Sequence, residues 1–422
     1  MIVTRLRLAN LRAIEVAEFR FQAGFNLLVG VNGVGKTSVL DALSVCLSAV
    51  TKETNKLKGR VVTFGNDDIR ATAEALTVEC EAKVGEHSHT YVIHKPRQAS
   101  ATRESKAGMP REQVLDTPER AEFLGDAPAP ISGNEVGGRP AAVLFSTNRA
   151  VPSERAPSSR VAAGGIEAAF SGALAGRELR LGEFAAWMRV QEALNKERPV
   201  ASLVLRAFEE AIRRFLPGYT NFRLGGRDGQ QLRIDCGATT IPVRLLSDGE
   251  RGTLALVLDL TRRLAQANPR LADPAADAGA VVLIDEIDLH LHPKWQRQIV
   301  HNLQAAFPRC QFIATTHSPQ VIGEVEHDRI QIMTPGQVYS PTHSYGVDSS
   351  RLLEEVMDSA SRTTGAQQLI SEASQAIASH QFNRARRLID DLEQLTRNPN
   401  DAEVTRLRTL LNFVEGKNEG DH

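Results

Sequence analysis

The chain has 422 residues, of which 42% are hydrophobic and 24% charged, an ordinary composition for a globular protein of two or three domains. Its net charge of −1 excludes a globally basic nucleic-acid-binding surface but leaves room for a local basic patch. The four scattered cysteines and the absence of a bilayer-length apolar run or a signal-peptide pattern predict a cytoplasmic protein with reduced, mostly buried thiols.

The N-terminal sequence predicts a β-hairpin and then a phosphate-binding loop. Residues 2–21 (IVTRLRLANLRAIEVAEFRF) alternate apolar and polar side chains, which is the pattern of paired strands. Residues 25–30 (FNLLVG) form an apolar strand that leads directly into 30–37 (GVNGVGKT), and 38–50 has a helical pattern. The segment 30–37 matches G-x-x-x-x-G-K-[ST] in the strand–loop–helix context that a phosphate loop requires.

Each part of this loop suits the binding of a nucleotide. The glycines let backbone N–H groups point at phosphate oxygens, and the helix N-terminus adds partial positive charge. Lys36 would bridge the β- and γ-phosphates, and the Thr37 hydroxyl would bind Mg²⁺. A chance glycine-rich turn is the alternative, but it does not explain the flanking strand and helix. The residues predicted to contact nucleotide are Asn32, Gly33, Val34, Gly35, Lys36, Thr37 and Ser38.

The middle of the chain alternates predicted strands with two insertions. Residues 96–140 contain six prolines and few aromatic residues, so we expect an irregular surface excursion there. Residues 161–216 have apolar side chains at helical spacing and end at Pro217-Gly218. The predicted strands of this region are 75–84, 89–95, 141–145, 221–226, 231–236 and 239–246.

Two later segments carry polar side chains at the ends of apolar strands. In 280–288 (AVVLIDEID), Asp285 would hold the water shell of Mg²⁺ and Glu286 would act as general base, unless the acids simply cap the next helix. A helix is predicted at 293–306. A strand follows it and ends in 312–320 (FIATTHSPQ). Alone, His317 would be a surface histidine in a turn. A parallel neighbouring strand would put it beside Asp285, where it could contact a γ-phosphate or orient water. We therefore predict Lys36, Glu286 and His317 as catalytic residues, and Thr37 and Asp285 as metal ligands.

Other polar clusters favour simpler roles. His290 and His292 are two residues apart without a third ligand nearby, which does not make a tetrahedral zinc site. Two basic runs are either solvated faces or DNA contacts. The tail has apolar side chains at helical spacing and predicts three or four helices. The basic runs are Lys52, Lys56, Lys58 and Arg60, and then Arg149, Arg155 and Arg160.

The stretch 246–253 (LSDGERGT) lies at the start of a predicted helix, between the phosphate loop and the Asp285-Glu286 pair. Its Leu246, Ser247, Gly249 and Arg251, with Glu250 beside them, resemble the signature of ABC-type ATPase heads. The resemblance implies that the serine hydroxyl and backbone N–H groups form an anion cradle for the ATP of a second subunit, so that two ATP molecules lie between two heads. Ser247, Gly249 and Glu250 are on this basis further nucleotide-binding residues.

The opening sequence is similar to the RecF, SMC and OLD branch of these ATPases. Residues 161–216 are too short for SMC arms, and RecF-like chains lack the block around IDEIDLHLHPKWQ. OLD-type chains carry a Toprim nuclease after the head, but no Glu…DxD set of the Toprim type is found in this sequence. The acidic pair Asp390-Asp391 in the tail lies in a helical pattern typical of solvated acids. Within this branch the chain most resembles the ATPase subunit of Septu-type antiphage defence, including retron-linked versions.

This resemblance carries expectations about ligands and partners. It implies ATP and Mg²⁺, a homodimer or higher homo-oligomer, and a separate HNH-type nuclease subunit, since no His/Asn/His nuclease set can be assembled from this chain. Arg12 resembles an arginine that contacts the nucleotide phosphate or base. Residues 146–149 occupy the position of the Q-loop but contain no glutamine, so the residue that would meet Mg²⁺ or water there is open. The tail is either a docking platform or a cap on the sheet edge.

The predicted fold is α/β, a P-loop NTPase of the ABC-ATPase head type with an antiparallel β subdomain. The head covers 1–348, with an irregular insertion at about 96–140 and a helical insertion at about 161–216, and 349–422 form a helical C-terminal appendix. The predicted function is ATP hydrolysis by heads that dimerise around ATP and regulate a partner nuclease. The alternatives are a RecF-like DNA-binding repair ATPase and an ATP-stabilised scaffold with little turnover.

Overall fold

The chain divides into two compact units, Met1–Val347 and Asp348–His422. The computed structural model describes residues 1–58, 61–97, 119–131, 138–150, 165–176, 181–195, 199–216, 218–226, 231–347, 349, 352, 363–397 and 401–420. None of the helices in these ranges is long and apolar enough to cross a membrane. Three of the cysteines are buried, and Cys236 is exposed.

The described strands of the first unit form three sheets, of which the mixed sheet β14-β13-β3-β12-β11-β7 is the core. Strands β13, β3, β12, β11 and β7 run parallel, and β14 joins β13 antiparallel. Both faces of a parallel sheet are covered, which explains why runs such as AVVLI are apolar at every position. The strands are β3 (Phe25–Gly30), β7 (Ala141–Phe145), β11 (Ala280–Ile284), β12 (Gln311–Thr316), β13 (Ile330–Thr334) and β14 (Gln337–Tyr339).

A second sheet is antiparallel, with strand order β2-β1-β4-β5-β6. It contains the predicted N-terminal hairpin. Its edge strand β6 lies inside 96–140, so the expectation of a wholly irregular excursion was wrong. Phe123 of β6 packs on Tyr91 with ring centroids 4.8 Å apart, and this contact comes from a distant strand rather than from local pattern. Residues 98–118 and 132–137 lie outside the described residues. The strands are β1 (Ile2–Leu11), β2 (Ile14–Arg20), β4 (Ala75–Val84), β5 (His87–Pro96) and β6 (Arg120–Leu124).

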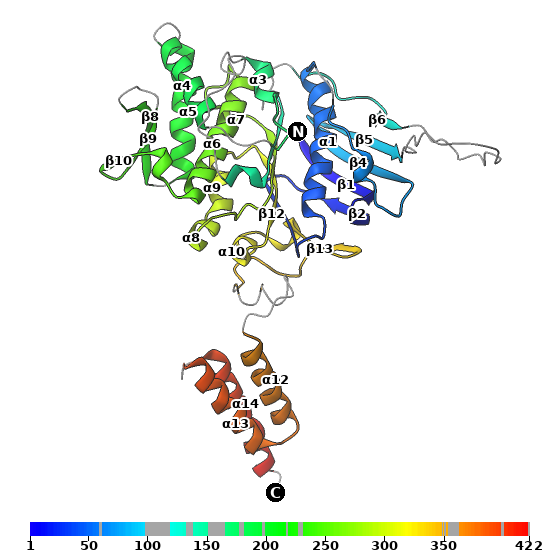
Figure 1. Cartoon of the computed structure of the whole chain (residues 1–422), viewed down its shortest axis with the longest axis vertical. Helices are drawn as coiled ribbons and strands as arrows, with labels where there is room; N and C mark the ends of the chain where they lie inside the picture. The colour runs from blue at the N-terminus through cyan, green and yellow to red at the C-terminus, as the bar shows by residue number, and fades with distance from the viewer. Residues whose placement is uncertain are drawn as a thin grey trace, which may run out of the picture. The chain divides into compact units, whose positions relative to one another are not determined.

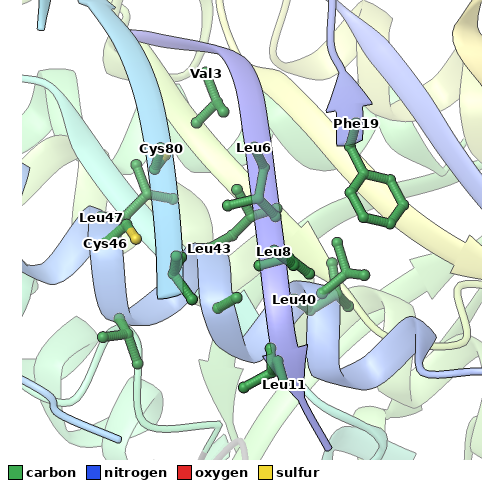
Figure 2. Packing of buried hydrophobic residues seen from close by; sticks show 14 of the residues in the cluster. Val3, Leu6, Leu8, Leu11, Phe19, Leu40, Leu43, Cys46, Leu47 and Cys80 are labelled. Carbon is green, nitrogen blue, oxygen red and sulfur yellow. The ribbon is translucent and has the colours of Figure 1, made fainter. Parts of the chain in front are cut away.

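Helix α1 (Lys36–Asn55) lies between these two sheets and contacts strands of both. Leu6 and Leu8 of β1 face Leu40 and Leu43 of the helix, as Figure 2 shows, and all four side chains are at most 1% exposed. Burying a side chain of this size contributes about 1.5–3 kcal/mol. The core therefore fixes the helix whose first turn closes the phosphate loop.

A group of helices lies on the side of the core sheet away from α1, and the third sheet packs against helices α4 and α5 of this group (Figure 1). Phe184, Trp187 and Phe208 pack their rings together inside the helical insertion. The predicted helix 293–306 is divided at Arg297–Gln298 into α8 and α9. The elements are α3 (Ile166–Phe170), α4 (Leu181–Asn195), α5 (Pro199–Phe215), β8 (Tyr219–Gly225), β9 (Gln231–Cys236), β10 (Thr239–Pro242), α6 (Asp248–Ala267), α7 (Pro274–Asp277), α8 (Pro293–Gln296), α9 (Ile299–Ala306) and α10 (Pro319–Ile322).

A buried ion cluster holds α6 in this layer. Asp259 accepts from Arg262 at 2.5 Å and from Arg263 at 2.6 Å, and Arg263 also donates to the Ala169 carbonyl at 2.7 Å. Burial would raise the pKa of Asp259, but Arg263 and Arg262 hold it well below its usual range. The cluster therefore stabilises the fold above the unfolded-state pKa of about 3.9, and this contribution is lost as the pH falls below that value.

Replacing Asp259 by asparagine is expected to destabilise the first unit by about 3–5 kcal/mol, because it removes the carboxylate that both buried guanidinium groups contact. Urea-induced unfolding measures the change. The control is Asp248→Asn on the same helix, where the partner pair with Arg251 involves an exposed carboxylate and is worth at most about 1 kcal/mol. Equal losses in the two variants would contradict a special role of the buried cluster.

The described residues of the second unit form α12 (Thr364–Ala378), α13 (Phe382–Thr396) and α14 (Ala402–Gly420). Ala373, Ile389, Leu392 and Leu407 are among the side chains of its own small core. Asp390 is exposed and accepts from Arg408 at 3.2 Å. The observed architecture confirms the predicted fold class, a P-loop α/β head with an antiparallel β subdomain, a helical insertion and a helical C-terminal appendix.

Candidate functional site

The loop between β3 and α1 can form only with glycine at two positions. A Cβ at Gly30 would lie 2.5 Å from the Met333 carbonyl oxygen, and one at Gly35 would lie 2.9 Å from Ile14 Cγ1. Gly35 also has φ +107°, in the left-handed region that favours glycine. Asn32 and Gly33 are exposed, Val34 is half-buried, and Ser38 is buried at the start of the helix. The loop backbone is therefore open to a ligand on one side.

The Lys36 ammonium group lies inside this loop. The side chain is 7% exposed, and Nζ donates to the carbonyl oxygens of Gly30 at 2.8 Å and Val31 at 3.0 Å. Burial lowers the pKa of Lys36, while the nearby carboxylates, Asp285 foremost, oppose that shift. The loop thus holds a cation among its own carbonyl groups, where an anion would meet it.

The ends of three parallel strands meet at the loop. Strand β12 lies between β3 and β11, with Thr316 opposite Val29 and Ala314 opposite Ile284. This confirms the prediction that the strand ending in His317 runs beside the strand ending in Asp285. The Thr37 hydroxyl donates to Asp285 Oδ2 at 3.1 Å, which joins the first turn of α1 to the end of β11.

Thr315 orients both acids. Its hydroxyl donates to Asp285 Oδ1 at 2.7 Å and accepts from the Glu286 backbone N–H at 2.7 Å. The Asp285 backbone N–H donates to the Phe145 carbonyl at 2.8 Å. Thr316 donates to Asp288 at 2.6 Å. Sequence reasoning missed Thr315, Thr316 and Asp288. The available signal was the threonine pair before His317, at the end of the neighbouring strand.

Glu286 has a strained backbone. Its φ is +47°, a conformation that costs a non-glycine residue of order 1–3 kcal/mol and tends to persist at functional sites. Its N–H donates to Thr315, and the preceding Asp285 accepts from Thr37, so these contacts hold the backbone in this conformation. This geometry suits the general base that the sequence predicted.

His317 is half-buried at the end of β12. Burial lowers its pKa, and the charge of Lys36 lowers it further, while Asp288, Glu286 and Asp285 oppose the shift. With a pKa below the ordinary value of about 6.5, the imidazole is neutral at pH 7. The structure therefore brings His317, Lys36 and the two acids into one electrostatic cluster.

Arg12 reaches the first turn of α1 from the turn between β1 and β2. Its Nη1 donates to Asp41 at 2.6 Å and to the Ser38 hydroxyl at 3.4 Å, and its Nη2 lies 2.8 Å from Asp68. The guanidinium is thus beside the phosphate loop, where two carboxylates partly neutralise it. An arginine in this setting can orient the helix start as well as contact a ligand.

The strand end at the Q-loop position contacts the helical insertion. Ser146 and Asn148 both donate to the Gly176 carbonyl, at 2.7 and 3.4 Å, and Thr147 begins a short 3₁₀ turn. Of the basic runs, Lys52 and Lys56 lie in or at the end of α1, at the end away from the loop. The side chain of Arg149 and the whole of Arg60, Arg155 and Arg160 lie outside the described residues.

The signature residues form the N-terminus of α6. Ser247 is the N-cap, and its hydroxyl accepts from the Glu250 N–H at 3.3 Å. A Cβ at Gly249 would lie 2.4 Å from the His290 carbonyl oxygen, so only glycine lets this helix start pack against the loop that follows Asp285 and Glu286. His292 accepts from the Lys294 N–H at 3.3 Å and caps α8. The start of α6 therefore packs directly against the segment that follows the two acids.

Comparison with known proteins shows that the chain is similar to AAA domains and to proteins of retron and Septu systems. A family model described as "AAA domain, putative AbiEii toxin, Type IV TA system" matches residues 177–323, and one described as "AAA domain" matches 5–127. The retron Ec83 probable ATPase of Escherichia coli is 41% identical over 174 residues, covering 41% of this chain and 32% of that one. The Septu protein PtuA of Bacillus mycoides is 47% identical over 74 residues, which are 18% of this chain and 10% of the relative.

A DNA double-strand break repair ATPase also resembles the chain. The Rad50 ATPase of Thermoplasma acidophilum is 40% identical over 106 residues, covering 25% of this chain and 10% of that one. The chain matches about a third or less of the length of these relatives. The resemblance predicted from the sequence is confirmed: the relatives include a probable retron ATPase, a Septu protein and a Rad50 ATPase.

Proposed function

We propose that the chain binds ATP with Mg²⁺ and hydrolyses it to ADP and phosphate. The observation that carries this proposal is the Thr37–Asp285 contact of 3.1 Å beside the buried Lys36 ammonium. A hydroxyl and a carboxylate are the oxygen ligands that Mg²⁺ prefers, and the glycine loop with its lysine suits a polyphosphate. The residues present therefore fit the nucleotide and its metal.

The chain's own side chains divide the chemistry between them. Lys36 and the backbone N–H groups of residues 32–38 bind phosphate oxygens, while Thr37 and Asp285 hold the metal. When bound, Mg²⁺ supplies positive charge that neutralises the phosphates. Glu286 accepts the proton of the attacking water, and neutral His317 donates a hydrogen bond toward the γ-phosphate.

The assembly and its biological role belong to the same proposal. Ser247 and Gly249 bind the γ-phosphate of a second copy, so the active form is a dimer or a higher oligomer. In that form it regulates a separate nuclease in antiphage defence. The likeness to a probable retron ATPase and to a Septu protein supports this role. The separate helical unit Asp348–His422, with Leu395 and Phe413 exposed, is a suitable docking platform.

Metal removal tests the catalytic part of this proposal. Phosphate release in the presence of ATP and Mg²⁺ is expected to stop on chelation with EDTA and to return when Mg²⁺ is added back. Thr37→Ala is expected to raise the Mg²⁺ concentration for half-maximal turnover by at least about tenfold, because a metal ligand is lost. Thr72→Ala, at an exposed threonine of the same unit, is the control. Turnover that persists in EDTA would contradict the proposal.

A DNA-repair ATPase is the second candidate, and the likeness to Rad50 favours it. On this alternative the chain alone would bind DNA in an ATP-dependent manner. The affinity would fall steeply between 50 and 200 mM salt, since phosphate contacts release counterions. Filter binding of a random-sequence duplex measures this directly, and a nuclease would then not be required for function.

A further inference from the structure

In this structure the signature serine is already occupied by an anion of its own chain. The Glu250 carboxylate accepts from the Ser247 backbone N–H at 3.0 Å and from the Ser247 hydroxyl at 2.7 Å, both through Oε2. Ser247 is exposed at the helix start. Its two donors, which a phosphate oxygen would use, both point at a carboxylate instead.

A phosphate and this carboxylate compete for the same two donors. A hydroxyl has one proton, and it is directed at Glu250. Two anions a few ångströms apart repel each other, so Glu250, which the resemblance placed among the nucleotide-binding residues, instead has to move before a γ-phosphate reaches Ser247. Glu250 is only partly exposed. If it loses both Ser247 donors at once, its partly buried carboxylate loses most of the stabilisation that these hydrogen bonds provide.

Tyr219 provides Glu250 with a second anchor. Its hydroxyl donates to Glu250 Oε1 at 2.7 Å, the oxygen that does not bind Ser247. The tyrosine is the first residue of β8 and pairs with Cys236 of β9, so its position is set by the small sheet rather than by α6. Burial raises the pKa of Tyr219, and the bond to Glu250 raises it further, which keeps the phenol a donor at neutral pH.

We propose that Tyr219 is a positioning residue of the signature, which retains Glu250 when Ser247 turns to the phosphate of a partner subunit. With Tyr219 present, Glu250 rotates away from Ser247 and keeps one strong hydrogen bond. Without it, Ser247 is the side-chain donor left to Glu250 among the described residues, and releasing the serine costs more. The inference rests on the proposed binding of a second copy's ATP.

The test uses sedimentation of the full chain with Mg²⁺ and a non-hydrolysable ATP analogue. It measures the concentration of the analogue that gives half-maximal dimer formation. Tyr219→Phe is expected to raise this concentration roughly tenfold, the scale of one hydrogen bond to a charged group. Maximal ATP turnover at saturating ATP is expected to stay unchanged. Glu250→Gln is expected to lower the half-maximal concentration, because a neutral amide does not repel phosphate. Tyr91→Phe, at a buried tyrosine of β5, is the matched control.

The double variant separates positioning from packing. In the Glu250→Gln background, Tyr219→Phe is expected to have no further effect. An equal effect of Tyr219→Phe in both backgrounds, or weaker dimer formation in Glu250→Gln, would overturn the inference. Dimers that form normally in Tyr219→Phe would overturn it alone and leave the proposed function intact. The absence of any ATP-dependent dimer in the wild type would instead contradict the proposed assembly itself.

Discussion

Replacing Glu286 by glutamine is expected to reduce ATP turnover by roughly 10²–10⁴-fold while leaving ATP affinity close to that of the wild type. Loss of a general base on this scale corresponds to about 3–5 kcal/mol of activation free energy. The amide keeps the size and hydrogen-bonding shape of the side chain but cannot accept the proton of the attacking water. Single-turnover phosphate release and equilibrium binding of labelled ATP measure the two quantities separately.

The backbone geometry at Glu286 is expected to be the same in the glutamine variant. Its φ of +47° and the bond from its N–H to Thr315 do not depend on the side-chain carboxylate, so the glutamine variant keeps the same strained geometry. Asp285 keeps its contacts with Thr37 and Thr315 as well. A defect in turnover without a defect in binding would therefore report on chemistry rather than on folding.

Asp288 provides the sharper comparison, since it is a second carboxylate near Lys36 and His317. Thr316 already donates to it at 2.6 Å, which suits a structural role. Asp288→Asn is expected to reduce turnover less than Glu286→Gln, and the exposed Glu326→Gln is expected to leave it unchanged. If Asp288→Asn were inactive and Glu286→Gln active, the general base would be Asp288.

The sequence was most informative where chemistry and secondary structure are contiguous. The loop from Gly30 to Thr37 lies between a strand and a helix in the sequence as in the structure, so its motif and context could be read together. The neighbourhood of His317 and Asp285 followed from the rule that consecutive parallel strands pair, and the observed pairing of β11 with β12 agrees.

Contacts between distant segments had no such signal. Thr315 holds Asp285 across 30 residues, and Tyr219 reaches Glu250 across 31, and neither pairing leaves a periodic pattern. Strand β6 was missed because its burial comes from the Tyr91–Phe123 contact and its other side chains are largely exposed. Local sequence motifs predicted which residues could bind nucleotide or take part in catalysis. Tertiary contacts determine which neighbouring residues position them.

Mixing two inactive variants is expected to restore activity if the signature acts on the nucleotide of a partner. Lys36→Ala removes the ammonium that the phosphate loop holds, and Ser247→Arg fills the cradle at the start of α6. Each variant alone is expected to be nearly inactive. In a mixed dimer, one site combines both defects and the other combines an intact loop with an intact signature. With free subunit exchange, half of the dimers are mixed and the expected recovery is about a quarter of wild-type turnover.

Within one chain, the phosphate loop and the signature contact different groups. The carboxylates of Asp285, Glu286 and Asp288 interact electrostatically with Lys36. Glu250, beside the signature, accepts hydrogen bonds from Ser247 and Tyr219 instead. Gly249 packs against the His290 carbonyl, so the start of α6 lies against the segment that follows the acids. If ATP turnover does not recover after verified subunit exchange, either the signature binds the nucleotide of its own chain or the two sites hydrolyse ATP only together. Counting bound ATP per mixed dimer separates these two cases. A dimer whose sites hydrolyse ATP only together still binds one nucleotide at its intact site.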